Sequence, residues 1–544
     1  MSKLIHNYTF WLFTVACLML FSHLDVIEVN IMEARNFITA REMAINNHWI
    51  LTTINDLPRY EKPPMPTWLT AISGIIFGFD SLYGMRLPVV LITLLLVFGT
   101  FKLSEKLGLS KKQSFHNGLI LITSFYIYFA GRDNQWDMYT HSFMMICILF
   151  LWEVLNETKK PLFNVLMAGL FFGFSFLSKG PISVYALLLP FLIAYGFTYK
   201  FQLKNKKLYL ILILVLGIVI GLSWPLYVKW ADPATYLKVT KIESSRWGNY
   251  NTRPFYYYWS FFTQSGIWTV PAFIALIYPY LKNKVSNLKA YQFTLIWTLA
   301  AVVLLSIVPE KKSRYLLPVL IPMALNTGFY IEYLINNFKN ISLKKEKGIV
   351  YFAFGLIGII CIAIPIGIFI RVKNDIAGFE FWLIALTVSL LTIGYILFTN
   401  LRSKNFIKVF YAVIAVQVVV VVFGIPFTKL ILKNPDYASA KAIREKEKSF
   451  GVRTYELNAF TPEIIWDYGF SILILLNEET NKLNLPAESK FGLLALETDT
   501  ITSKKEFQNY NVKKVSNIDL NHVPTDSKKH NDRLTRTFYI VTKK

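Results

Sequence analysis

The chain has 544 residues, of which 54% are hydrophobic, 16% aromatic and only 17% charged. A soluble protein carries about a quarter charged residues, so this composition excludes an ordinary soluble domain. The net charge of +23 does not indicate a nucleic-acid partner, because the basic residues lie in short loops without interleaved aromatics. Apolar runs of about 20 residues predict an α-helical polytopic membrane protein.

Hydropathy predicts about 13 transmembrane helices, with the N-terminus in the cytoplasm. The predicted spans are 8–24, 85–104, 116–131, 139–155, 162–178, 181–198, 208–229, 256–281, 290–308, 315–335, 348–371, 378–399 and 406–425. This arrangement puts the basic loops inside, as the positive-inside rule requires. Those loops contain Lys111, Lys112, Lys159, Lys160, Lys204 to Lys207, Lys282 to Lys289, Lys344 to Lys347 and Arg402 to Lys408. The loops expected outside are 25–84, 132–138, 179–180, 230–255, 309–314 and 372–377, with the chain after about residue 430.

The first outer loop is long, and we expect two juxtamembrane helices in it. The first is predicted from Glu33 to Asn46. The second, Thr67 to Phe79, is apolar but too short to cross a bilayer comfortably, and its Trp68 suits the headgroup zone. Between them lies a charged string with two prolines, Arg59-Tyr60-Glu61-Lys62-Pro63-Pro64.

From about Pro435 the composition changes to mixed polar sequence with short β-rich runs, such as Phe538 to Val541. Segments 439–448 and 462–476 are predicted to be helices. A stretch of about 110 residues can fold alone, so a small α/β domain is expected here. The predicted organisation is a transmembrane catalytic domain over 1–430 and an extracytoplasmic α/β domain over 431–544.

Ionisable residues gather in the predicted outer loops, and such residues near membrane depth indicate function. The residues are Glu33, Arg35, Arg59, Glu61, Lys62, Arg132, Asp133, Asp137, Lys179, Glu243, Arg246, Arg253, Lys311, Lys312 and Arg314, with Tyr60, Tyr256, Tyr257 and Tyr315 among them. Lys and Arg can bind a lipid phosphate and stabilise its charge as it leaves. A carboxylate can deprotonate an acceptor hydroxyl or stabilise an oxocarbenium-like sugar, and aromatic rings can stack on the sugar.

Each candidate also has a structural interpretation. Asp133 and Asp137 suit the start of the next helix, and Glu33 suits a first helical turn. Pro181 fits the first position of a helix. Lys311 is expected to be a solvated outer charge rather than a site residue.

The spacing of the cysteine and histidine residues predicts neither a disulfide framework nor a metal site. Cys17, Cys147 and Cys361 all lie in apolar runs, so neither a metal cluster nor a disulfide framework is expected. No His-rich spacing indicates a metal site.

Several motifs in chain order resemble one family, the family 39-like glycosyltransferases of the GT-C superfamily. It includes protein O-mannosyltransferases and the bacterial transferase that puts aminoarabinose on lipid A. The motifs are Glu33 to Met43, Trp49, Tyr60 to Pro64, Trp68, Phe77-Gly78, Arg86-Leu87-Pro88, Arg132 to Asp137, Ser178 to Pro181 and Lys312 to Pro318. The likeness covers roughly residues 8–330, and Tyr-Glu-Lys-Pro-Pro after an Ala-Arg-Glu-Met helix is its most specific combination.

The resemblance implies an inverting enzyme that moves a sugar from a polyprenyl-phosphate carrier to a lipid, protein or glycan acceptor. It implies the bacterial cytoplasmic (inner) membrane, with the active site facing the periplasm and lipid A modification as one branch. Asp137 and Glu33 would be catalytic. The carrier would be bound by Arg35, Arg59, Tyr60, Glu61, Lys62, Lys179, Arg246, Arg253, Lys312, Arg314 and Tyr315. No cofactor is firmly implied, although the aminoarabinose branch would place a divalent metal at Glu61.

One departure from the family pattern lies in the first loop. The family usually has Asp-Glu, one residue, then Arg-Tyr, whereas this chain has Met32 for the Asp and Asn36 for the Tyr. The departure makes Asp137 the stronger catalytic candidate. Two other functions remain as hypotheses: a transporter or flippase for a lipid-linked sugar, and an enzyme-like sensor of carrier lipid. A transporter is typically built from two related halves, and no internal repeat occurs here.

Overall fold

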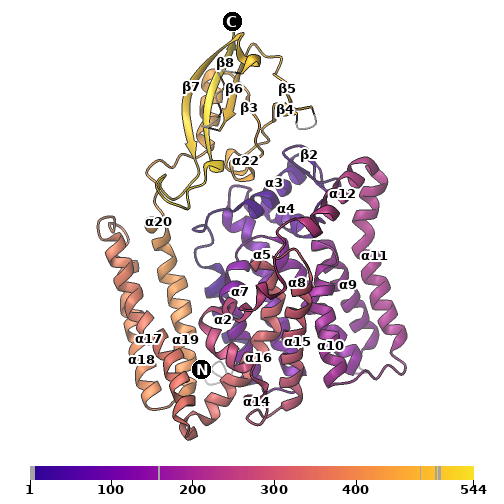
Figure 1. Ribbon diagram of the computed structural model, residues 1–544, viewed down its shortest axis with the longest axis vertical. Coiled ribbons are helices and arrows are strands. Elements are labelled where there is room, and N and C mark those ends of the chain that lie inside the picture. Colours follow the sequence, from indigo (N-terminus) through magenta and orange to yellow (C-terminus); the bar gives the residue numbers. More distant parts are fainter. Residues whose placement is uncertain (1–6, 157–159, 478–479, 497–498, 500, 502–503) are drawn as a thin grey trace.

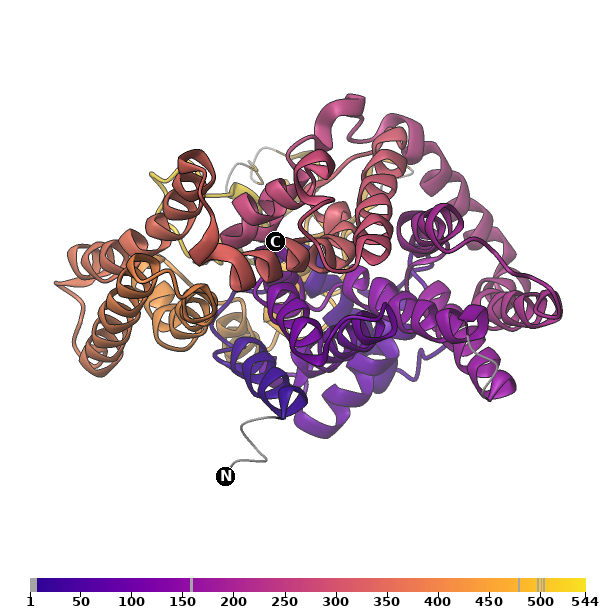
Figure 2. The same cartoon turned by 90° about the horizontal axis from the view of Figure 1, so that it is seen from below.

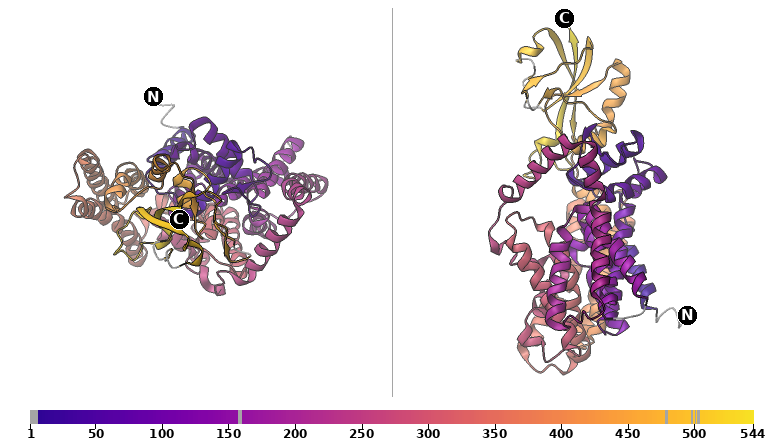
Figure 3. Two further views of the ribbon diagram at one scale, coloured as in Figure 1. Left: turned by 90° about the horizontal axis from the view of Figure 1, so that it is seen from above. Right: turned by 90° about the vertical axis from the view of Figure 1, so that its right-hand side faces the viewer.

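The computed structural model describes residues 7–156, 160–477, 480–496, 499, 501 and 504–544, so Lys159 of the expected basic loop lies outside the described residues. A helical body extends from α2 to α20, and a smaller part that contains a sheet stands on one end of it (Figure 1). The described chain begins toward the opposite end of the body, as a side view also shows (Figure 3).

Nine helical segments of the described chain are long and apolar enough to cross a membrane, which defines an integral membrane protein. They are α5 (Leu82–Lys106), α8 (Trp136–Asn156), α9 (Pro161–Lys179), α11 (Lys207–Ala231), α15 (Leu288–Ile307), Ser313–Asn340 around α16 (Leu317–Asn337), α17 (Lys344–Val372), α18 (Glu380–Arg402) and Phe406–Ile431, which begins with α19 (Phe406–Val419) and ends with α20 (Thr428–Ile431). Each overlaps a predicted span. Helices α17, α18 and α19 form a group at one side of the body (Figure 2).

The four other predicted spans are shorter or interrupted in the structure. Helix α2 (Tyr8–Phe21) has only 14 residues. The span at 116–131 divides into α6 (Lys111–Ile122) and α7 (Phe125–Ala130). The span at 181–198 contains a π-helical turn, η1 (Val184–Leu188), before α10 (Leu189–Thr198).

The fourth of these segments, 256–281, is not a single helix. It consists of the 3-10 segments η2 (Phe255–Tyr258) and η3 (Phe261–Trp268), followed by α13 (Thr269–Ala275) and α14 (Tyr278–Leu281). The chain breaks at Gly266, whose φ of +66° is strained for residues with a side chain. Hydropathy does not reveal this break, because the segment as a whole is apolar.

The end of the body nearest the sheet is built from the first long loop and α12 (Figure 1). Helix α3 (Ile31–Ile45) confirms the predicted helix, and the side chain of Asn30 caps it by accepting from two backbone N–H groups. A short hairpin, β1 (Thr53–Ile54) with β2 (Leu57–Pro58), leads to the predicted second helix, α4 (Met65–Phe77). Helix α12 (Pro233–Asn249) follows α11 directly.

The C-terminal part contains a four-stranded mixed sheet in the order β3-β6-β8-β7. The strands are β3 (Thr454–Glu456), β6 (Lys490–Ala495), β8 (Thr535–Lys543) and β7 (Tyr510–Asp519), and only the β3–β6 pair is parallel. Helices α21 (Lys441–Phe450) and α22 (Pro462–Tyr468) and a small hairpin, β4 (Leu476–Asn477) with β5 (Lys482–Leu483), accompany it. Helix α22 is shorter than the predicted 462–476, because Gly469 ends it at φ +98°.

The C-terminal part packs directly on α3. Arg41 donates to the backbone oxygens of Ile465 and Trp466 at 3.3 and 3.4 Å, and its guanidinium lies 5.4 Å from the Trp466 ring centroid. Phe37 also packs on Trp466, at 4.9 Å between ring centroids. The first outer loop is therefore held between the membrane helices and the C-terminal part.

Small residues let α9 and α11 approach closely, as is typical of helix pairs in membranes. A Cβ atom at Gly217 of α11 would lie 1.9 Å from the Phe172 side chain of α9. One at Gly173 of α9 would lie 2.5 Å from Ile220 of α11. This contact fixes the position of α9, which ends at Lys179.

Candidate active site

An ion pair between neighbouring helices forms the centre of the candidate site. Asp137 lies in the first turn of α8, and Lys179 is the last residue of α9. The Lys179 ammonium donates to Asp137 Oδ1 at 2.5 Å, and both side chains are largely buried. Because α8 and α9 are consecutive and antiparallel, the start of one meets the end of the other.

The chain before α16 adds an aromatic and cationic wall. The Lys179 ammonium lies 5.1 Å from the ring centroid of Tyr315, and the Arg314 guanidinium lies 5.7 Å from the same ring. Glu310 accepts from Tyr315 Oη at 3.0 Å and from Lys312 Nζ at 2.8 Å. The predicted residues Lys312, Arg314 and Tyr315 are therefore together beside Lys179.

The first outer loop adds Lys62, a further cation, to the candidate site. Lys62 lies 3.9 Å from Glu243 of α12. Burial, and then the charge of Lys179, lower the pKa of Lys62 to about 8. The second effect places Lys62 within electrostatic reach of the Asp137–Lys179 pair, and its ammonium form still predominates at pH 7.

Arg59 joins α3 to the start of α8. Its Nη1 donates to Arg35 O at 2.7 Å and to Thr39 Oγ1 at 2.6 Å, and its guanidinium lies 4.9 Å from the ring centroid of Trp136. Glu61 is its ion-pair partner at 4.0 Å. Arg59 thus positions the loop next to Asp137 rather than offering a free charge.

Among the predicted carrier-binding residues, two buried guanidinium nitrogens, Arg35 Nε and Arg314 Nε, have no hydrogen-bond partner in the described part of the chain. Such donors are costly to bury unless a ligand or water satisfies them. Arg314 also interacts electrostatically with Asp137. Both nitrogens are suited to an anionic ligand.

The remaining predicted carrier-binding residues lie farther from this centre. Tyr60 donates to Asp232 at 3.1 Å. Arg246 is exposed and pairs with Glu243 at 2.6 Å, which connects it to Lys62 only through that shared carboxylate. Arg253 lies beside Tyr257, at 6.0 Å from the ring centroid.

Glu33 is enclosed in a different arrangement from that of a free catalytic base. It has no exposed surface, and Arg86 binds both of its oxygens, at 2.7 Å from Nε and 2.6 Å from Nη2. Asn134 N also donates to Glu33 Oε1 at 3.1 Å. The first-turn interpretation of Glu33 is confirmed, and its hydrogen bonds make it a structural anchor for the 132–137 segment.

Asp133 lies in that segment and accepts from Asn30 Nδ2 at 2.9 Å. Burial, and then the charge of Glu33, raise the pKa of Asp133 to about 7. Within the described part of the chain its side chain accepts from the amides of Asn30 and Gln135 and from no backbone N–H group of α8, so Asp133 does not cap that helix.

Sequence reasoning misjudged Lys311 and missed several partners. Lys311 is only 3% exposed, and its ammonium donates to Arg253 O and Val308 O, so the prediction of a solvated charge is wrong. The missed partners are Arg86, Asn134 and Glu310. A buried arginine at the start of a span requires a counter-ion, and that requirement was the available signal for Arg86.

A metal at Glu61 does not fit the residues present. The described residues contain no group of three or more His, Cys, Asp or Glu side chains that could hold a metal ion. Glu61 is 41% exposed and faces Arg59. No chemical step is therefore derived through a metal.

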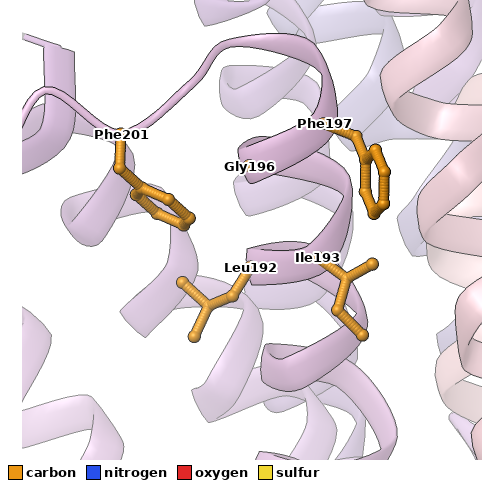
Figure 4. A pocket seen from close by; sticks show the side chains of 5 residues that line it. All are labelled: Leu192, Ile193, Gly196, Phe197 and Phe201. Atoms are coloured by element: carbon orange, nitrogen blue, oxygen red, sulfur yellow. The ribbon is translucent and has the colours of Figure 1, made fainter.

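An apolar hollow of about 460 Å³ at α10 lies apart from this cluster. Its lining residues are Leu192, Ile193, Gly196, Phe197 and Phe201 (Figure 4). Such a lining has no polar side chain to orient a reacting group, and it suits contact with lipid chains.

Comparison with known proteins supports a likeness to the GT-C glycosyltransferases. The model of the family described as dolichyl-phosphate-mannose-protein mannosyltransferase matches residues 61–224, which contain Lys62, Asp137 and Lys179. Two structures of ArnT from Cupriavidus metallidurans, one apo and one bound to undecaprenyl phosphate, match with a TM-score of 0.68. At 14% identity over 99% of this chain and 98% of theirs, the likeness establishes the fold.

Sequence relatives lie in the aminoarabinose branch. The undecaprenyl phosphate-alpha-4-amino-4-deoxy-L-arabinose arabinosyl transferase 2 of Proteus mirabilis is 24% identical over 61% of this chain and 60% of its own length. The corresponding transferase of Pseudomonas savastanoi pv. phaseolicola is 24% identical over 75% of this chain and 76% of its own. The matched region thus spans about 60% of the first relative. These findings confirm the resemblance to GT-C glycosyltransferases related to the lipid A aminoarabinose transferase.

Proposed function

We propose that this protein is an inverting glycosyltransferase that moves a sugar from a polyprenyl-phosphate donor to a hydroxyl acceptor. The observation that carries the proposal is the Asp137–Lys179 ion pair, flanked by Lys62 on one side and by Arg314 and Tyr315 on the other. A buried carboxylate among several cations suits a reaction that needs one base and leaves one phosphate. The ArnT fold and the names of the sequence relatives support the donor class.

In the proposed reaction, the acceptor hydroxyl attacks the anomeric carbon of the donor, and its proton passes to Asp137. The bond from the anomeric carbon to the phosphate oxygen breaks, and its electron pair leaves with polyprenyl phosphate. Attack opposite to the leaving group inverts the anomeric centre. Lys62 and Arg314 would stabilise the charge on the departing phosphate, and Lys179 would hold Asp137 in place.

The other residues of the cluster would shape the carrier site. We assign Arg35 and Lys312 to the phosphate, and Tyr60, Arg59, Glu61, Arg246, Arg253 and Tyr315 to the walls of the carrier groove. Glu33 acts through Arg86 and Asn134 as a positioning residue. With Asp137 as the base, the proposed reaction needs no acid at position 32, where this chain has Met32 and the family usually has an acid.

The proposed topology has 13 crossings, with the cluster on the periplasmic side of a bacterial inner membrane. The described chain begins with α2 toward one end of the helical body, and its C-terminal part stands on the other end, which fits an odd number of crossings between them (Figure 1). Nine long spans and the four shorter or interrupted segments satisfy this requirement. We propose residues 1–430 as the transmembrane catalytic domain and residues 431–544 as a periplasmic α/β domain.

The acceptor is proposed to be a lipid, protein or glycan that reaches the outer end of the body, and the family resemblance implies lipid A as one candidate. The C-terminal part packs on α3 through Arg41 and would border the acceptor path.

The test measures sugar transfer by the purified protein in lipid nanodiscs. The donor is undecaprenyl-phosphate 4-amino-4-deoxy-L-arabinose, and the acceptor is lipid A. The proposal expects formation of undecaprenyl phosphate and of inverted glycoside in equal amounts. A flippase would instead move the intact donor between leaflets of proteoliposomes without releasing undecaprenyl phosphate. A carrier sensor would bind the donor and leave it intact. Either of these results would refute the proposal.

A further inference from the structure

A second, polar cavity lies at the end of the body opposite the candidate active site. It has a volume of about 230 Å³ and is bordered by α6, by the loop between α14 and α15, and by the C-terminal half of α16. Helix α14 lies at the lower end of the molecule, far from the C-terminal part (Figure 1). No step of the proposed reaction uses this region.

The cavity contains a buried donor without a partner. Gln113 is 4% exposed and lines the cavity, and its Nε2 has no hydrogen-bond partner among the described residues. An unsatisfied buried amide costs roughly 1–3 kcal/mol unless a bound molecule satisfies it. The amide is therefore positioned for a ligand or for ordered water.

The opposite wall supplies fixed acceptors and donors. Glu332 Oε1 accepts from Asn336 Nδ2 at 3.2 Å, and Glu332 Oε2 lies 3.5 Å from His116 Nδ1. Asn283 and Asn337 also line the cavity. Amides and a carboxylate combine donors and acceptors, which is what a hydroxyl group requires because it both donates and accepts.

Lys284 is the one cation among the described residues that line the cavity, and its charge is already neutralised. Lys284 Nζ lies 2.8 Å from Glu346 Oε1, which also accepts from Tyr280 Oη at 2.5 Å and Tyr333 Oη at 2.8 Å. The ammonium lies 3.9 Å from the Tyr280 ring centroid. With this charge paired and Glu332 present, the cavity is poorly suited to a phosphate.

Aromatic surface completes the lining. Phe329 and Tyr333 face the cavity next to the amides, and rings of this kind pack on the apolar faces of cyclic molecules. The volume lies below the roughly 300 Å³ at which pockets for drug-sized ligands begin, so the occupant is a single ring.

We propose that this cavity binds a neutral polyhydroxylated ring, a sugar or cyclic polyol, at the end of the protein opposite the transfer site. The ring accepts a hydrogen bond from Gln113 and donates one to Glu332, while its apolar face packs on Phe329. The same chemistry is found in a free sugar and in the head group of a glycolipid.

The experiment uses the purified full-length protein and two kinds of probe. In detergent, equilibrium binding of tritiated D-glucose, D-mannose and myo-inositol is measured up to about 10 mM, a range suited to a weak site. In nanodiscs, hydrogen exchange at 282–287 is compared with and without monoglucosyl diacylglycerol. Saturable binding in the first arm identifies a free ring, and protection only in the second identifies a lipid head group.

Variants test whether the binding occurs in this cavity. Gln113→Leu removes the unpartnered donor and is expected to weaken binding about fivefold, the effect of losing one hydrogen bond. Gln202→Leu is the matched control, since Gln202 is an exposed glutamine outside the cavity lining, and it is expected to bind as the wild type does. If Gln113→Leu does not fold, Asn283→Ala, an exposed loop substitution in the lining, takes its place. No saturable binding or protection by any probe, or equal binding by lining and control variants, would overturn the proposal.

Discussion

Glu33 and Arg86 form a bidentate ion pair, with N–O distances of 2.7 and 2.6 Å, around a carboxylate that has no exposed surface. Arg86 also donates to the backbone oxygens of Leu24 and Ile27. The pair therefore ties α3 and α5 to the chain after α2. Glu33 directly follows Met32, the position at which the family usually has an Asp, and its hydrogen bonds are those of a structural anchor.

Replacing one partner of this ion pair is expected to destabilise the fold more than replacing both partners. Glu33→Gln leaves the Arg86 charge buried without a counter-ion, at a cost of about 3–5 kcal/mol. The double variant Glu33→Met, Arg86→Met is expected to be more stable than Glu33→Gln, because no unpaired charge remains. Thermal unfolding in detergent checks the order. Asp375→Asn, at the exposed ion pair with Lys433, is the control with little change.

A different result would return Glu33 to the catalytic role. If Glu33→Gln unfolds at the wild-type temperature but loses sugar transfer, its carboxylate acts in the reaction and the anchor assignment is wrong.

Asp133 is expected to make stability depend on pH. Its pKa is raised to about 7 in the folded protein, so the folded state binds more protons than the unfolded state between about pH 4 and pH 7. Stability contributed by the protonated form is present below the unfolded pKa and is lost as pH rises through 7. The unfolding temperature of Asp133→Asn should therefore fall less than that of the wild type between pH 5 and pH 8. Parallel curves for the two proteins would contradict this expectation.

Lys62 is expected to make carrier binding depend on pH. Because its pKa is lowered to about 8, its ammonium form is lost between pH 7 and pH 9, and affinity for undecaprenyl phosphate should fall over that range. Lys62→Arg should retain binding at pH 9, since a guanidinium stays charged. Lys62→Ala should bind weakly at every pH while unfolding at a nearly wild-type temperature. An identical pH dependence in wild type and Lys62→Arg would exclude Lys62 from the phosphate site.

Arg41 is expected to hold the C-terminal part on the helical body. Arg41→Ala removes its hydrogen bonds to Ile465 and Trp466 and the contact of its guanidinium with the Trp466 ring. Proteolysis of the 431–440 connection should become several-fold faster. Arg402→Ala, an exposed arginine at the end of α18, is the control. Equal cleavage rates in all three proteins would show that other contacts hold the two parts together.

Much of the helical body follows from the sequence, because apolar length alone specifies a span. Nine segments and helix α3 lie where hydropathy and periodicity predict them. The segment 256–281 does not, since the break at Gly266 depends on backbone conformation and not on hydropathy.

The sequence predicts which residues belong to the candidate site, but it does not predict which of them contact one another. Asp137 and Lys179 could each be chosen because charged residues are costly at span ends. Their 2.5 Å contact depends on how closely α8 and α9 pack, which no local pattern encodes. Lys311 was misjudged for the same reason, since its carbonyl partners belong to two separate turns of the chain.

The most direct test of the account is single-turnover sugar transfer by Asp137→Asn, compared with wild type, at saturating undecaprenyl-phosphate donor. If Asp137 takes the acceptor proton, the rate should fall by about 10²–10⁴-fold while the protein stays folded and still binds the donor. Its unfolding temperature should fall, because Lys179 is left largely buried without its counter-ion. The matched control is Asp232→Asn, because Asp232 caps α12 and contacts Tyr60 outside the ion pair. A wild-type transfer rate in folded Asp137→Asn would contradict the central claim.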